Sequence, residues 1–169
     1  MTKREVRIVD YDPQWAMFYE KERDQILGVI GHLVIAIEHI GSTAVCGLGG
    51  KPIIDIMVGV YQLTDADNCI EPLRSIGYEY VPKFETEFPE RRYLHKEGYH
   101  LHIVEKRSYF WKRHLLFRDY LRSHPEVAQQ YYQLKKELAS KHGSNREAYT
   151  KAKTSFIESI VAKAMDKHT

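Results

Sequence analysis

The fold prediction begins with residues 39–56, which read HIGSTAVCGLGGKPIIDI. A β-rich run, 33–40, leads into residues 41–50, which are dense in glycine and other small residues. A proline then opens a second apolar run, 53–60, and proline is tolerated at the first residue of a strand. These patterns predict a strand, a glycine-rich loop and a second strand.

Two features of this stretch are suited to phosphate binding. Gly41 lets a backbone approach a phosphate closely, and the Ser42 hydroxyl and the nearby backbone amides can donate hydrogen bonds to the phosphate oxygens. Asp55 lies between two isoleucines, where a carboxylate is costly to bury unless it is paired, hydrogen-bonded or bound to a cation. Asp55 is therefore interpreted either as a Mg²⁺ ligand facing a nucleoside triphosphate, or as an edge-strand aspartate that faces water or caps the loop.

The remaining sequence changes from mixed patterns to helical ones. Alternating residues and helix caps predict strands and two helices in the first part, and helical periodicity dominates after Ser108. We expect one domain over 1–169, sheet-rich in 1–106 and helical in 107–169, with an α/β (α+β) fold in which helices flank a mixed β-sheet. The predicted strands are 6–11, 33–40, 53–60, 78–83, 91–95 and 99–105, the last three as a meander, and the predicted helices are 13–29, 65–76, one beginning after Ser108, 125–142 and 147–165.

Composition and charge exclude several classes of protein. Hydrophobic residues are 43% and charged residues 28% of the 169 residues, as in soluble globular proteins. The longest apolar run is far shorter than the roughly 20 residues of a membrane span, and the first residues do not resemble a signal peptide. Two cysteines are too few for a disulfide framework. We therefore expect a cytoplasmic protein without a membrane partner.

Charge is distributed unevenly along the chain. Residues 1–105 carry 11 basic and 17 acidic side chains, whereas residues 106–169 carry 14 basic and 6 acidic ones. The basic third either supplies phosphate-binding side chains to a site or has solvated helical faces that dock on the acidic part. Because no run of five like charges occurs, nucleic acid is not an expected partner.

The quoted stretch, together with later strings, resembles the GrpB family of bacterial proteins. That family is assigned to the nucleotidyltransferase superfamily, which has a polymerase-beta-like fold. The resemblance covers roughly residues 4–165 and implies a nucleotidyltransferase-like mixed sheet with a helical C-terminal part. The later matching strings are HLHIV at 100–104, FRDYLR at 117–122, LK at 134–135 and YTKAK at 149–153.

The resemblance also exposes a departure at the acidic positions. Active members of the superfamily carry two acids one residue apart and a third acid on a later strand; here Asp55 matches the first, but Met57 stands at the second and His102 at the third. Methionine cannot bind a hard cation such as Mg²⁺. His102 and His100 share a strand face and could, with Asp55, ligate a transition metal. Either histidine could instead act as a general base, hold a phosphate when protonated, or be a structural, hydrogen-bonded residue.

The helical part offers further phosphate-binding candidates. Arg118 and Arg122 are four residues apart and share a helix face, as do Tyr149 and Lys153. This basic face could close over the sheet and bind phosphates. The alternative is that Arg118 or Lys153 pairs with acids of the N-terminal part.

Three other residues are expected to be structural. Trp111 and Tyr120 are interpreted as core aromatics, not as a platform for base stacking. Cys46 stands where the family pattern has proline, and no activating base or positive field is identifiable nearby. We therefore do not expect Cys46 to be a nucleophile.

These observations lead to a main functional hypothesis and two alternatives. We expect an enzyme that binds ATP or another nucleoside triphosphate with Mg²⁺ or Mn²⁺, Zn²⁺ being a further option, and transfers a nucleotidyl group to a small-molecule or protein acceptor. The alternatives are a non-catalytic protein that binds a nucleotide or phosphorylated metabolite, and a metal-dependent phosphohydrolase. The candidate residues are Asp55 and His102 for catalysis, Asp55, His100 and His102 for the metal, and Gly41, Ser42, Thr43, Lys51, Arg118 and Lys153 for the nucleotide phosphates.

Overall fold

The computed structural model describes residues 7–142 and 145–166. Its centre is a five-stranded sheet with the order β1-β2-β5-β4-β3. β2 and β5 pair in parallel, whereas the other neighbouring strands pair antiparallel, so the sheet is mixed as predicted. The strands are β1 (Ala36–Ile40), β2 (Ile54–Val60), β3 (Glu79–Tyr80), β4 (Arg91–Lys96) and β5 (Tyr99–Glu105).

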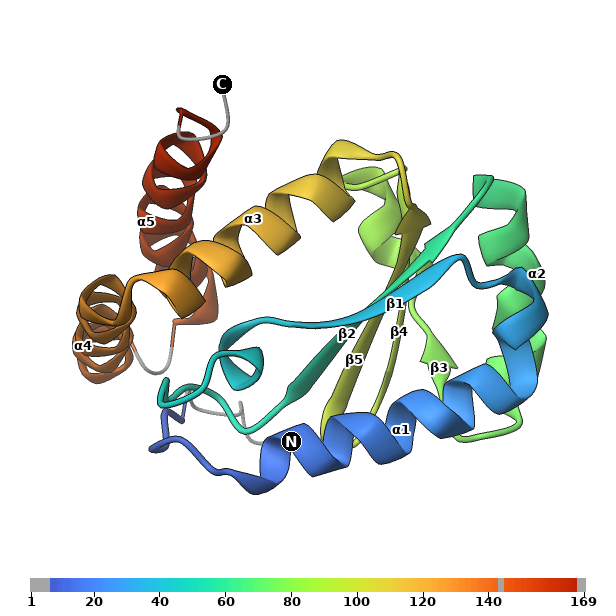
Figure 1. Cartoon of the computed structure of the whole chain (residues 1–169), viewed down its shortest axis with the longest axis horizontal. Coiled ribbons are helices and arrows are strands. Elements are labelled where there is room, and N and C mark those ends of the chain that lie inside the picture. The colour runs from blue at the N-terminus through green and yellow to red at the C-terminus, as the bar shows by residue number, and fades with distance from the viewer. Residues whose placement is uncertain (1–6, 143–144, 167–169) are drawn as a thin grey trace.

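Alternation along the two central strands divides the side chains between two faces of the sheet. One face of β2 and β5 carries branched aliphatic side chains that are almost wholly buried, including Ile56, Val58 and Ile103. Helices α1 (Gln14–Ile30) and α2 (Leu63–Arg74) cover this face, and Figure 1 shows α1 running along it. Most of the apolar core therefore lies on this side of the sheet.

The opposite face carries the polar residues of the central strands and is covered by α3 (Tyr109–Ser123). Ser108 caps this helix, because its Oγ accepts a hydrogen bond from the Trp111 amide at 3.2 Å. Trp111 packs against β2 at Gly59, where a Cβ would lie 2.9 Å from the indole ring. Trp111 is thus a core aromatic, as predicted.

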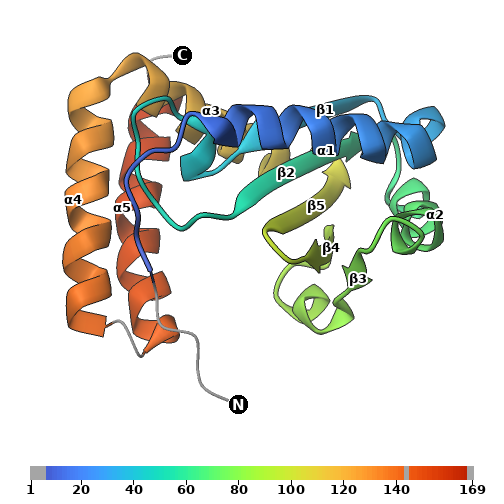
Figure 2. The ribbon, with the colours of Figure 1, turned by 90° about the horizontal axis from the view of Figure 1, so that it is seen from below.

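Two further helices, α4 (Pro125–His142) and α5 (Arg146–Asp166), follow α3. They lie side by side beyond the end of the sheet where β1 runs into the glycine-rich loop (Figures 1 and 2). The loop from Gly41 to Gly50 is therefore placed between the sheet and the C-terminal helices.

Several predicted boundaries differ from the observed ones. The predicted strand 6–11 is reduced, among the described residues, to a single antiparallel bridge between Val9 and Gly50. β1 begins only at Ala36, because residues 31–33 form a 3₁₀ turn. β3 is shorter than 78–83, because a 3₁₀ helix starts at Pro82, which has no amide hydrogen for a strand ladder. The meander of β3, β4 and β5 is confirmed.

None of the helices within residues 7–142 and 145–166 combines the length and the hydropathy that a membrane-spanning segment needs.

Candidate functional site

The register of the two parallel strands brings three predicted site residues together. Asp55 of β2 lies opposite His100 of β5, and Met57 lies opposite His102. Asp55 Oδ1 accepts a hydrogen bond from His102 Nε2 at 3.2 Å and lies 3.5 Å from His100 Nδ1. The cluster sits on the α3 face of the sheet, where one carboxylate faces two imidazoles.

Arg91 of β4 fixes the protonation state of this cluster. Its Nη1 donates to His102 Nδ1 at 3.2 Å, and because a guanidinium has no acceptor, Nδ1 must be unprotonated. His102 is therefore neutral, with its hydrogen on Nε2 facing Asp55. Burial lowers the pKa of His102, and the Arg91 charge lowers it further, although Asp55 opposes both effects. Burial would raise the pKa of Asp55, but the hydrogen bonds from both histidines hold it below its usual range.

Met57, at the position of the second acid, is an apolar core residue. It is fully buried in a cluster with Ile40, Val104, Phe110 and Trp111. The sheet therefore supplies one carboxylate at this point, not two.

The turn after β1 packs directly on the Asp55 carboxylate. Gly41 has φ of 77°, in the left-handed region that favours glycine, and a Cβ there would lie 2.9 Å from Asp55 Oδ2. Ser42 follows in a 3₁₀ turn, and its Oγ accepts a hydrogen bond from Lys135 Nζ of α4 at 2.5 Å. Because Gly41 has no side chain, the turn after β1 can lie against the Asp55 carboxylate while Ser42 contacts Lys135 of α4.

Three lysines from separate segments lie around the same space. Lys135 Nζ also donates to Gly49 O at 2.8 Å, and the side chain is only 2% exposed. Lys51 and Lys153 place their ammonium groups 4.9 and 5.4 Å from the centre of the Tyr149 ring. Burial and repulsion from Lys153 and Lys51 lower the pKa of Lys135 to about 7, and burial lowers the pKa of Lys153.

These groups line one cavity of about 440 Å³ between the sheet and the C-terminal helices. Its volume is in the range of small-molecule sites. The lining combines Asp55 and the histidines on the sheet with cationic and aromatic side chains from the helices. The lining residues are Ile40, Gly41, Ser42, Lys51, Ile53, Asp55, Arg91, His100, His102, Arg113, His114, Phe117, Tyr131, Lys135, Tyr149, Thr150, Lys153 and Ile157.

Two predicted phosphate ligands do not line this cavity. Thr43 is buried, and its Oγ1 lies 2.8 Å from His39 Nε2. Arg118 donates to Glu38 at 2.8 Å and to Asp119 at 2.9 Å. Of the two interpretations of Arg118, the structure therefore supports the ion pair with an acidic residue of the N-terminal part.

The structure adds residues that the sequence prediction did not include. Arg91, Lys135 and His114 all line the cavity. His114 Nδ1 donates to Phe110 O at 2.8 Å, and burial lowers its pKa to about 4, so the ring is neutral near pH 7. Lys135 belongs to one of the motif strings, which could have drawn attention to it, whereas nothing in the local sequence distinguishes Arg91 from the many surface arginines.

Metal ligation stays a prediction. Within the part of the chain that the structure describes, no group of three His, Cys, Asp or Glu side chains is arranged to hold a metal ion. Instead, His102 directs a protonated nitrogen at Asp55, and its other nitrogen faces Arg91. To become a ligand, His102 would have to exchange one of these contacts.

Comparison with known proteins places the chain in a family. The family model described as GrpB protein matches residues 5–163. The UPF0157 protein YqkA of Bacillus subtilis is 38% identical over 92% of this chain, which spans 46% of that relative's length. The glutamate-rich protein GrpB of Alkalihalophilus pseudofirmus is 35% identical, with 95% of this chain and 97% of the relative covered.

Solved structures agree with this placement. The crystal structure of the conserved protein GrpB from Enterococcus faecalis has a TM-score of 0.87 at 36% identity and covers 96% of this chain and 99% of its own. Cid1 in complex with the UTP analogue UMPNPP has a TM-score of 0.52 at 15% identity, covering 78% and 40%. Terminal uridylyl transferase 4 from Trypanosoma brucei with bound CTP has 0.54 at 13%, covering 90% and 51%. The fold is therefore similar to that of nucleotidyltransferases, and the chain belongs to the GrpB family.

Proposed function

We propose that this protein binds a nucleoside triphosphate in the cavity beside Asp55 and transfers its nucleotidyl group to an acceptor. The observation that carries the proposal is the convergence of Lys51, Lys135 and Lys153 on one cavity that also contains Asp55 and the Gly41 turn. Neither Lys135 nor Lys153 forms an ion pair with a described carboxylate. Burying several ammonium groups together is costly unless a polyanion joins them, and a triphosphate supplies that charge.

The donor set also fits one hard divalent cation when a triphosphate is present. Mg²⁺ is commonly held by one or two carboxylates together with substrate phosphate oxygens. Asp55 is ionised near pH 7, because its pKa lies below the usual range, and it lies next to the Gly41 turn. Asp55 would hold Mg²⁺ or Mn²⁺, and the ion when bound would neutralise charge on the phosphates.

Each part of the cavity then has a role in nucleotidyl transfer. The lysines bind the β- and γ-phosphates, which leave as pyrophosphate when the bond between the α-phosphorus and its bridging oxygen breaks. The acceptor forms the new bond to the α-phosphorus and releases its proton to solvent. The Gly41 turn keeps the phosphates next to Asp55, and Ser42 is held in place by Lys135.

A non-catalytic nucleotide-binding protein is the second candidate. Met57 and the neutral His102 leave Asp55 as the sole carboxylate of the cluster, whereas two-metal catalysis uses several oxygen ligands. A protein of this kind would retain the lysines and the cavity and bind the nucleotide without turnover.

Calorimetric titration of ATP, GTP, CTP and UTP, with and without Mg²⁺ or Mn²⁺, tests the binding step. We expect Lys153→Met to weaken binding about tenfold or more, since contacts to charged groups contribute about 1.5–3 kcal/mol. Lys151→Met is the matched control, because Lys151 is exposed on the same helix, and its affinity should equal that of the wild type. Asp55→Asn should remove the dependence on the cation. Equal affinity of Lys153→Met and wild type would contradict the proposal.

Transfer is tested separately with triphosphates labelled at the α-phosphate and a panel of small-molecule and protein acceptors. Label transfer with release of pyrophosphate, abolished by Asp55→Asn, supports the enzyme. Metal-dependent binding without transfer by either form supports the non-catalytic candidate.

A further inference from the structure

The cavity contains another cationic group, the Arg91 guanidinium, in addition to the lysines. Arg91 forms none of the ion pairs found among the described residues. Its Nε is buried and has no hydrogen-bond partner there. Its one hydrogen bond to a side chain goes to the neutral ring of His102. A buried donor that lacks a hydrogen-bond partner is costly, and an oxyanion would satisfy it.

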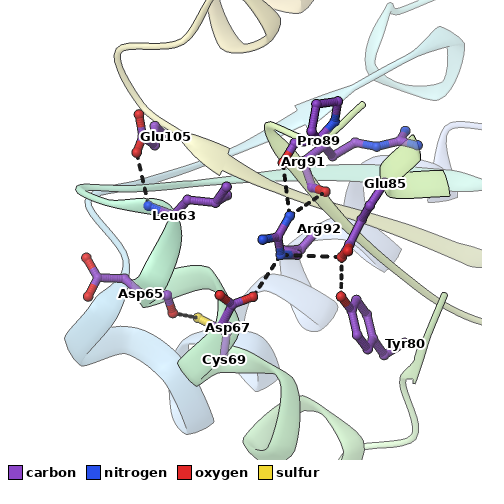
Figure 3. A network of polar contacts seen from close by, with 10 residues as sticks. All are labelled: Leu63, Asp65, Asp67, Cys69, Tyr80, Glu85, Pro89, Arg91, Arg92 and Glu105. Carbon is purple, nitrogen blue, oxygen red and sulfur yellow. Dashed lines mark hydrogen bonds and ion pairs between the residues drawn. The ribbon is translucent and has the colours of Figure 1, made fainter. Parts of the chain in front are cut away.

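Two other arginines near Arg91 can be compared with it, and both have acidic partners. Arg113, which also lines the cavity, pairs with Glu158 at 3.2 Å. Arg92 follows Arg91 on β4 but lies on the opposite face, where its Nε bonds Asp67 at 2.7 Å and lies 3.3 Å from Glu85 (Figure 3). Among the described residues, each of these two arginines thus has a carboxylate within ion-pair distance, whereas Arg91 has none.

Aromatic rings define the surroundings of the Arg91 guanidinium. Its Cζ lies 4.7 Å from the ring centre of Phe88, 5.1 Å from Tyr93 and 5.7 Å from Phe110. These contacts between the rings and the cation help to hold the planar group in place. A planar guanidinium with free N–H groups is suited to two parallel hydrogen bonds with a carboxylate or phosphate.

The strand order separates this arginine from the lysines. In the order β1-β2-β5-β4, the Gly41 turn that follows β1 and the strand that carries Arg91 lie on opposite sides of Asp55. A triphosphate held by the lysines therefore lies on one side of Asp55 and leaves Arg91 for another ligand.

We propose that Arg91 is the anion-binding residue of a second subsite, and that the acceptor in the proposed transfer carries a carboxylate or phosphate group bound there. The identification of this ligand as the acceptor rests on the proposed function. The oxyanion subsite itself rests on the unpaired guanidinium in the cavity.

The Nε–H resonance of Arg91 reports on the subsite directly. We would record ¹H–¹⁵N spectra of arginine side chains in the full-length protein, with Arg91→Lys to assign the signal. Sodium acetate and inorganic phosphate would be titrated separately at constant ionic strength. The Arg91 signal should shift saturably with at least one anion, and the stronger response identifies a carboxylate or a phosphate as the preferred group. The Arg92 signal is the matched control and should not move, because its Nε already bonds Asp67.

The same titrations in Lys153→Met separate this inference from the proposed function. The Arg91 shift should persist there, while triphosphate binding is weakened about tenfold or more. An Arg91 signal that responds to neither anion, or that drifts linearly in parallel with Arg92, overturns the subsite even if the wild type binds triphosphates. A saturable Arg91 response in a protein that binds no triphosphate keeps the subsite and rejects the transferase.

Discussion

Replacing the buried Lys135 by methionine should change how stability depends on pH. Burial and the two neighbouring lysines lower the pKa of Lys135 from 10.5 to about 7 in the folded protein. Between these values the unfolded chain holds a proton that the folded protein lacks, so the free energy of unfolding rises with pH. The slope is about 1.4 kcal/mol per pH unit for one group. Below pH 7 both states are protonated, and the full penalty is constant at about 5 kcal/mol.

Methionine of similar length removes this titration together with two hydrogen bonds, to Ser42 and Gly49. Those bonds offset much of the penalty, at about 1.5–3 kcal/mol each, so the absolute stabilities at pH 6.5 should be similar. The decisive quantity is the change with pH. From pH 7.5 to pH 9.5, wild type should gain about 3 kcal/mol relative to Lys135→Met.

Urea denaturation at intervals between pH 6.5 and pH 9.5 measures this difference, provided that unfolding is two-state. Lys136→Met is the control, because Lys136 is the exposed neighbour on the same helix and should show no pH-dependent difference from wild type. A difference between wild type and Lys135→Met that stays constant within about 0.5 kcal/mol over this range would refute a buried, neutralisable lysine.

Three further outcomes follow from the site and its surroundings. Gly41→Ala should cost about 1–3 kcal/mol of stability and weaken triphosphate binding, because the new Cβ meets Asp55. The control Gly47→Ala, with φ of 82° and open space around the new Cβ, should cost only the strain of its backbone and leave binding unchanged. Equal triphosphate affinities of Gly41→Ala and wild type, measured in samples that denaturation shows to be folded, would argue against the close approach. Arg118→Met should lower the free energy of unfolding by about 2 kcal/mol, because its carboxylate partners lose their cation. Calorimetry should show an unaltered triphosphate affinity, and a tenfold loss of that affinity would contradict the structural role of Arg118. Burial lowers the pKa of His39 to about 4, so the stability that neutral His39 contributes is present above pH 6.5 and is lost as the pH falls toward 4, by about 1.4 kcal/mol per pH unit. In His39→Gln the free energy of unfolding should therefore fall less steeply with decreasing pH, by that amount. An unchanged slope would count against a neutral, buried His39.

The strands of the central sheet could be predicted from short-range patterns, and the Asp55 cluster from those patterns together with the resemblance to the GrpB family. Alternating apolar residues define β2 and β5, and a side-chain period of two places His100 and His102 on one face. Parallel pairing of these two strands then places Asp55 opposite His100 and within reach of His102. The resemblance to the GrpB family, read from separated motifs, is confirmed by the family match.

The remaining part of the site depends on contacts between distant segments, which local patterns do not encode. Lys135 meets Ser42 across 93 positions, and Arg118 meets Glu38 across 80. The spacing of residues on a helix predicts the helix face on which Arg118 lies, but it does not predict which distant residue the Arg118 side chain contacts. Arg91 gains its significance from having no ion-pair partner among the described residues, and the sequence around it does not encode this property.

The loop between β1 and β2 is held in place by a helix made much later during synthesis. All five strands are complete once Glu105 has left the ribosome, but Lys135 and Lys153 are still to come. Chains are synthesised from the N-terminus at about 5–20 residues per second, so Lys135 and Lys153 leave the ribosome some seconds after the last strand. A nascent chain in that interval contains Asp55 and Lys51 but lacks the other two lysines of the cavity. The triphosphate site that we propose is therefore complete only after the last helix has docked.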